Sequence, residues 1–145
     1  MAIVAVACNR QSETFTARQI ENAVDSFATN YFNWHFLQAA QFVTDSSQVW
    51  LHYAASQVHQ ADIEILREKE DATVEIEGIT TTAPTTASVL VTVRNFLGMD
   101  TIGTEGHIVH KARFSLPVEE VQEQGKRVWK IRMASLPQNG KQSRD

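Results

Sequence analysis

The sequence predicts an α+β domain in which N-terminal helices pack on one face of an antiparallel sheet. Apolar residues recur at helical spacing through the first half of the chain and then alternate with polar residues, the pattern of strands that bury one face. The connections between the expected strands are short, which favours an antiparallel meander over parallel strands. The apolar face of such a sheet must be buried, and the helices are the elements available to cover it.

The first helix is expected to begin near Thr16. Thr16 and Gln19 have the spacing of a capping box, in which two side chains satisfy backbone N–H groups at the start of a helix. The apolar residues that follow are spaced by four, three and four positions and therefore share one face of the helix: Ile20, Val24, Phe27 and Tyr31.

Shorter helices are expected in the residues that follow. Asn33 can cap a second helix, and residues 44–47 form a break with a new N-cap for a third. Residues 61–68, with an acidic exterior, form a further short helix. The helical part of the chain therefore ends near residue 70.

The remaining chain has the period of two that is typical of strands. The threonine-rich residues 80–86 are expected to form a loop, a turn is expected within residues 98–106, and Pro117 ends or edges the third strand. Phe114 and Trp129 are expected to be buried against the first helix. Four segments alternate in this way: residues 73–77, 89–94, 108–115 and 128–133.

Length and composition indicate a single globular domain. The chain has 145 residues, of which 43% are hydrophobic and 21% charged. A formal net charge of −4 argues against a dedicated nucleic-acid-binding protein. We therefore divide the chain into an N-terminal signal remnant or flexible segment (residues 1–12), one domain (13–137) and a polar tail (138–145).

Cys8 is the only cysteine in the sequence, so the chain cannot form an intrachain disulfide. It ends an apolar run and is followed at once by polar residues. The segment Ala5–Cys8 resembles the end of a bacterial lipoprotein signal, although leucine is commoner at the position of Ala5 and no basic segment precedes the run. The resemblance implies a lipid anchor at Cys8 and a place in the bacterial cell envelope, facing the periplasm or the exterior. The alternative is a short strand or tail with an inert thiol.

Three stretches carry a resemblance to a known fold: residues 31–44 with the nearby Trp50, residues 95–100 and residues 129–133. Their aromatic placement and the order of the elements resemble the NTF2-like superfamily, in which a curved sheet wraps a long N-terminal helix to form a cone. The same stretches are similar to those of small bacterial envelope lipoproteins without known activity. The resemblance covers Thr16 to Leu136 and implies the cone fold.

This resemblance implies three alternative functions. We favour a non-enzymatic cell-envelope domain that binds a small apolar ligand or a protein partner. Ketosteroid-isomerase-like and SnoaL-like enzymes share the fold, as do the periplasmic domains of VirB8-like secretion and conjugation proteins. Members of the last group usually have an N-terminal transmembrane helix, and no run in this sequence approaches the roughly 20 apolar residues of such a span.

Five residues are candidates for a ligand-binding site. The alternation of the strands predicts that Asn95 and His110 point toward the helices. Two polar side chains among apolar walls could orient a ligand. Tyr31, Trp34 and His35 lie at the end of the first helix and in the elements that follow, near the expected mouth of the cone. The alternative is a structural role, as polar groups satisfied by the backbone or as part of an aromatic core.

The sequence offers no catalytic or metal-binding set. His107 and His110 are three residues apart, but on a strand they point to opposite faces, so we expect no metal and no cofactor. An isomerase-type site needs a carboxylate base inside the cone. Glu75 and Glu77 alternate with apolar residues and point outward, so we expect no inward carboxylate on the strands, although an aspartate of the helices could enter the cone.

Basic residues are expected to form a stripe on the outer face of the sheet. Such a stripe could bind an acidic partner or anionic head groups, or it could pair across strands with Glu75 and Glu77. Apolar residues interrupt this face, which also allows a homodimer through the sheet. The basic residues with outward parity are Arg94, Lys111, Arg113, Lys130 and Arg132.

Overall fold

The computed structural model describes residues 2–98 and 106–134, with side chains described from Thr16 onward. Two short 3-10 turns, η1 (Ala40–Phe42) and η2 (Asp45–Ser47), separate the second and third helices. The described helices are α1 (Ala2–Phe32), α2 (Phe36–Ala39), α3 (Gln48–Ser56) and α4 (Gln60–Glu68). The described strands are β1 (Thr73–Ala83), β2 (Thr86–Gly98), β3 (His107–Glu123) and β4 (Lys126–Ile131).

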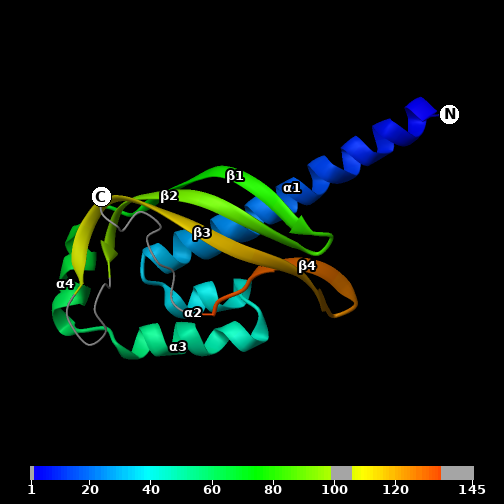
Figure 1. Cartoon of the computed structure of the whole chain (residues 1–145). Helices are drawn as coiled ribbons and strands as arrows, with labels where there is room; N and C mark the ends of the chain where they lie inside the picture. Colours follow the sequence, from blue (N-terminus) through cyan, green and yellow to red (C-terminus); the bar gives the residue numbers. More distant parts are fainter. Residues whose placement is uncertain (1, 99–105, 135–145) are drawn as a thin grey trace.

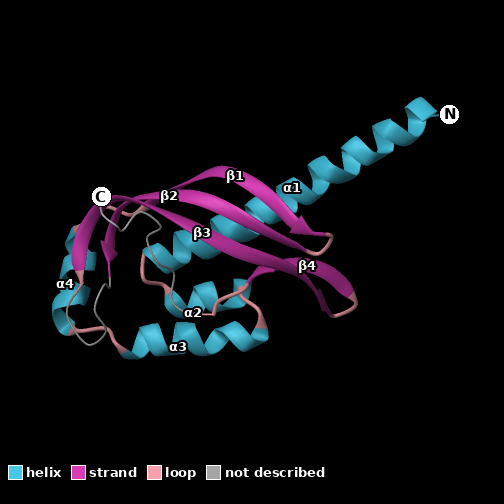
Figure 2. Cartoon of the chain, in the orientation of Figure 1, coloured by secondary structure: helices cyan, strands magenta, loops and turns pink. Residues whose placement is uncertain are grey.

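The four strands form one antiparallel sheet in the order β1-β2-β3-β4. Figure 1 shows α1 running along one face of the curved sheet, with α2 and α3 on the same side and α4 at one end. Figure 2 shows the two layers that result, helices on one side and strands on the other. The expected α+β class, with helices before an antiparallel meander, is therefore confirmed.

The first helix is longer than expected. It begins at Ala2, so Thr16 lies inside α1 and the prediction that Thr16 caps the helix is wrong. No glycine or proline interrupts the sequence from Ala2 to Phe32, and a capping-box spacing has no effect where the helix already continues. The first turns of α1 project beyond the sheet (Figure 1).

Three of the four strands are longer than expected, whereas β4 has the expected length but begins and ends two residues earlier. Residues 80–83 belong to β1 and not to a loop, and β3 continues through Pro117 to Glu123. The Pro117 carbonyl accepts a hydrogen bond from Arg132 N, just past the end of β4. In an antiparallel ladder the N–H and C=O of one residue point to the same neighbouring strand. The nitrogen of Pro117 therefore faces the β4 side, so the absence of its N–H breaks no hydrogen bond to β2.

Asn95 reverses the alternation of β2. Its φ of 57° is left-handed, a conformation that asparagine tolerates better than most residues. Phe96, which the alternation assigns to the outer face, is consequently buried at 5% exposure. The Phe32 ring of α1 packs against Phe96 and Phe114, with ring centroids 5.2 Å and 4.7 Å away.

The core between α1 and the sheet is apolar and well covered. Phe114 and Trp129 are buried at 5% and 8% exposure, as expected. The fully buried side chains of this core include Val24 and Phe27 of α1, Val89, Val91 and Val93 of β2, and Ile131 of β4.

Two side-chain clamps tie the helices to the strands. The prediction that Asn33 caps α2 is wrong. Its amide group instead exchanges hydrogen bonds with the backbone of Ala72, at 2.7 Å and 3.4 Å. At the other clamp, the buried Asp62 carboxylate accepts hydrogen bonds from His59 N (2.9 Å) and Gly106 N (2.8 Å). Asn33 thereby fixes the end of α1 beside β1, and Asp62 fixes α4 beside β3.

Candidate functional site

An aromatic cluster surrounds Tyr31 where α1 ends, and we call it the Tyr31 cluster. Tyr31 stacks on Phe27 at a ring-centroid distance of 5.4 Å, which is the contact expected four residues apart on a helix. Its ring also meets the edges of Phe32 and Phe36, at 4.9 Å and 5.3 Å. Trp34 joins the cluster through Phe36, with ring centroids 5.4 Å apart.

The Tyr31 hydroxyl is the polar group of this cluster. Tyr31 is half-buried as a residue, and its hydroxyl makes no hydrogen bond with any residue that the structure describes. Burial raises the pKa of this hydroxyl well above the ordinary value of tyrosine. Like an ordinary tyrosine, the group is protonated at neutral pH and can donate a hydrogen bond, and its raised pKa extends the protonated form to higher pH.

The structure separates Trp34 and His35. Trp34 has a left-handed φ of 63°, and its indole N–H donates to Leu97 O at 2.8 Å, so its polar atom is already satisfied. His35 is exposed at the N-terminal end of α2 and makes no capping hydrogen bond with its side chain. Of the three residues expected at the mouth of the cone, Tyr31 and Trp34 lie together and His35 points away from the cluster.

Asn95 and His110 do not point into the core as expected. Asn95 donates from its side-chain amide to Glu70 O at 3.1 Å, on the exposed side of the strand. His110 is exposed. For Asn95 the expectation fails because it extended the alternation of β2 through a residue whose left-handed backbone interrupts it. His110 lies on β3 opposite this interruption, between the register pairs Arg94–Lys111 and Phe96–Val109.

Two polar groups on the inner face of the sheet were not expected from the sequence. Glu120 has the same parity as the buried Leu116 and Val118 of β3, and its side chain is only 19% exposed. Trp129, its neighbour on β4, has a buried indole N–H without a hydrogen-bond partner. The expectation of no inward carboxylate is therefore wrong. It ended β3 at Pro117, whereas continuing the alternation through Pro117 reveals Glu120.

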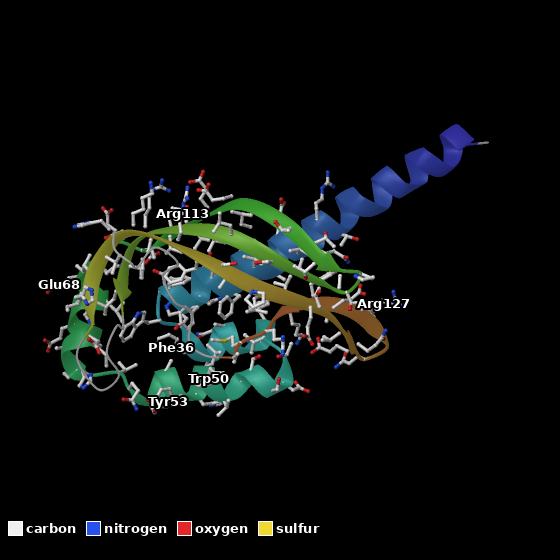
Figure 3. All side chains as sticks on the ribbon, viewed as in Figure 1. Phe36, Trp50, Tyr53, Glu68, Arg113 and Arg127 are labelled. Carbon is white, nitrogen blue, oxygen red and sulfur yellow. The ribbon has the colours of Figure 1, made fainter. Side chains whose placement is uncertain are left out.

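The outer face of the sheet carries cross-strand ion pairs. Arg94 lies 3.0 Å from Glu75, and Arg113 lies 3.9 Å from Glu77. Figure 3 shows Arg113 on the outer side of the sheet and Phe36 on the inner side, among the helices. The alternative in which the basic stripe pairs with Glu75 and Glu77 is confirmed for these two arginines. Binding of an acidic partner and a homodimer through this face stay predictions.

Within the described residues, no group of three or more histidine, cysteine, aspartate or glutamate side chains could hold a metal ion. No described helix is long and apolar enough to cross a membrane.

The comparisons with known proteins bear on the fold. No family model matches the chain, and no curated protein sequence matches it. Among solved structures, the chain is similar to an NTF2-like protein of unknown function from Shewanella oneidensis, with a TM-score of 0.52 and 13% identity. The match covers 81% of this chain and 97% of that chain. The protein has the NTF2-like fold. A likeness at this identity extends to the fold and not to an activity.

In this NTF2-like domain, the Tyr31 hydroxyl should destabilise the fold at alkaline pH. Above a pH of about 10, the ordinary pKa of tyrosine, the unfolded chain releases the Tyr31 proton while the folded chain retains it. The free energy of unfolding should therefore fall by up to about 1.4 kcal/mol per pH unit more in the wild type than in Tyr31→Phe. Urea unfolding between pH 8 and pH 11 measures both slopes. Equal slopes would show that the hydroxyl is well solvated.

Proposed function

We propose that this protein is a non-catalytic binding domain of the bacterial cell envelope, which takes a small apolar ligand or a partner's apolar side chain at the Tyr31 cluster. The Tyr31 hydroxyl carries the proposal, because it lies among aromatic rings without a hydrogen bond to a described residue. Tyr31 is half-buried, so a ligand can reach its hydroxyl and accept a hydrogen bond from it. Pockets that bind apolar ligands commonly have aromatic walls and a few polar groups that orient the ligand.

The chemistry of the cluster supports binding over catalysis. The Tyr31 hydroxyl is protonated at neutral pH, as an ordinary tyrosine is, and burial raises its pKa further, so it can donate a hydrogen bond but cannot act as a base there. Glu120 lies six residues beyond Phe114, which contacts the neighbouring Phe32. Six residues of strand span about 20 Å, so Glu120 cannot reach a ligand held at Tyr31.

The second candidate is an isomerase-type enzyme, and the inward position of Glu120 is the observation that favours it. In this alternative, Glu120 would be the base and the substrate would lie near the β3–β4 hairpin. Figure 3 shows Arg127 of that hairpin at the opposite end of the sheet from Glu68 of α4. The two candidates therefore predict different positions for the bound molecule.

The sequence around Cys8 supports attachment to a membrane through a lipid. Small residues precede the cysteine and polar residues follow it. The first turns of α1 project away from the sheet (Figure 1), so an anchor on this part of the chain would leave the domain clear of the bilayer. Acyl chains would supply membrane affinity of about 0.8 kcal/mol per buried CH₂.

Acetophenone should bind the Tyr31 cluster, because its ring can stack on aromatic side chains and its ketone oxygen can accept from the hydroxyl. Tyr31→Phe removes that hydrogen bond and should weaken binding about 2- to 10-fold, the equivalent of a net 0.5–1.5 kcal/mol. Ethylbenzene has a similar shape but no acceptor, so its affinity should be the same for both proteins. Ligand-observed NMR titration measures the four affinities.

Equal weakening of both compounds would mean that Tyr31 contributes only packing, and failure of acetophenone to bind would contradict a site at this cluster.

Steroid-like, polyketide-like and epoxide compounds incubated with the protein should be recovered unchanged by mass spectrometry. Conversion that disappears in a folded Glu120→Gln variant would instead establish the enzyme.

Expression of the complete gene in a bacterium should attach lipid to Cys8. We expect the gene to encode a basic segment and a longer apolar run upstream, as lipoprotein signals require. Metabolic labelling with a palmitate analogue should mark the wild type in the membrane fraction and should not mark Cys8→Ala. An unlabelled wild-type protein in the cytosol would exclude the anchor without affecting the ligand site.

A further inference from the structure

A second polar group, the Trp129 indole N–H, lies on the inner face of the β3–β4 hairpin. Trp129 is 8% exposed, and its indole Nε1 is buried without a hydrogen-bond partner. Trp129 shares the inward face of β4 with the fully buried Ile131. An indole N–H that loses water on folding usually gains a protein acceptor, and this one does not.

A carboxylate with spare acceptor capacity lies directly across the ladder. Glu120 is the register partner of Trp129, and its side chain is 19% exposed. Its described ion pair is with Arg127, at 3.9 Å, which is too long for a hydrogen bond. The Arg127 side chain is itself 72% exposed, so this pair is weak and can open.

We propose that Trp129 and Glu120 together bind an amide group. Residues directly opposite in an antiparallel pair lie about 4.5–5.5 Å apart, so one small group can reach both side chains. The amide oxygen would accept from the Trp129 indole, and the amide N–H would donate to the Glu120 carboxylate. Val118 and Ile131, on the same face and both 1% exposed, are covered by the core and make this end of the sheet apolar.

An amide fits this pair better than other common groups do. An ester offers an acceptor and leaves Glu120 without a donor, whereas an ammonium ion offers donors and leaves the indole N–H without an acceptor. The amide can come from a small molecule or from the backbone of a peptide. This proposal goes beyond the Tyr31 site and does not depend on it, because the two sites use different elements. The Tyr31 cluster lies on α1 and α2, whereas Glu120 lies on β3, about 20 Å along the strand from Phe114.

The test is an NMR titration of the ¹⁵N-labelled protein, whose three tryptophans give three indole N–H signals. N-butylacetamide should shift the Trp129 signal saturably and leave the Trp50 signal unmoved. Butyl acetate and butylammonium should bind about tenfold more weakly, because each supplies only one of the two hydrogen bonds. N-acetyl-leucine N′-methylamide tests the peptide backbone as the source of the amide.

Three variants assign the binding to these atoms. Trp129→Phe keeps an aromatic ring and removes the N–H, and Glu120→Gln removes the charge. Each should weaken N-butylacetamide about fivefold or more by calorimetry. Trp50→Phe removes an indole on α3 and should leave the affinity unchanged. Because Glu120 is partly exposed, Glu120→Gln provides a folded test even if Trp129→Phe is unstable, and thermal melts monitored by circular dichroism check each variant.

Three results would overturn the proposal. The first is a Trp129 signal that does not move at the solubility limit of N-butylacetamide. The second is equal affinity for the amide and the ester. The third is a nuclear Overhauser contact between the Trp129 N–H and a long-lived water that the amide does not displace, which would identify the partner as structural water.

Discussion

The packing of Phe32 between Phe96 and Phe114 is the contact on which the rest of the structure depends. It joins the end of α1 to the two central strands, with ring-centroid distances of 5.2 Å and 4.7 Å. Edge-on and tilted aromatic pairs contribute about 0.5–1.5 kcal/mol beyond the area they bury. Tyr31 precedes Phe32 in the chain, so this contact also sets the position of the Tyr31 cluster.

Phe96 can take part only because the backbone changes at Asn95. A regular strand would turn Phe96 outward, where it would be exposed beside Arg94. The left-handed φ of 57° at Asn95 turns it inward instead. The side-chain amide of Asn95 then hydrogen-bonds to Glu70 O and ties this position to the segment before β1. One backbone conformation therefore determines both the core and the exposure of Asn95.

The fold could be predicted from the sequence because hydrophobic periodicity reports which face of each element is buried. Ile20, Val24 and Phe27 were assigned correctly to the core for this reason, and so was Trp129. Helix and strand ends were predicted less well, because a capping-box spacing such as that at Thr16 does not stop a helix that continues past it.

The candidate site was harder to predict than the fold. Asn95 was misplaced because periodicity carries no information on a single left-handed residue, and His110 lies across the ladder from it. Glu120 was missed because Pro117 was taken as the end of a strand, although a proline is tolerated where its nitrogen faces no ladder partner. The Tyr31 cluster was anticipated, since aromatic residues close together on a helix and its following turn remain close in space.

A chemically simple interior results from this packing. The inner face is apolar over most of its area, with the Tyr31 hydroxyl near the end of α1 and the Trp129–Glu120 pair at the β3–β4 hairpin. The outer face instead carries charge pairs between neighbouring strands, such as Arg94 with Glu75. The binding that we propose would use the inner face, whereas the charge pairs lie on the outer one.

The most direct test of this account is a double-mutant cycle between α1 and the sheet. Phe32→Leu, Phe114→Leu and the double variant would be unfolded in urea, and the coupling would be calculated from the three changes in the free energy of unfolding. We predict a coupling of about 0.5–1.5 kcal/mol, because each ring loses its partner when the other is replaced. Effects that add within about 0.3 kcal/mol would contradict it, since α1 would then be held by contacts other than this aromatic pair.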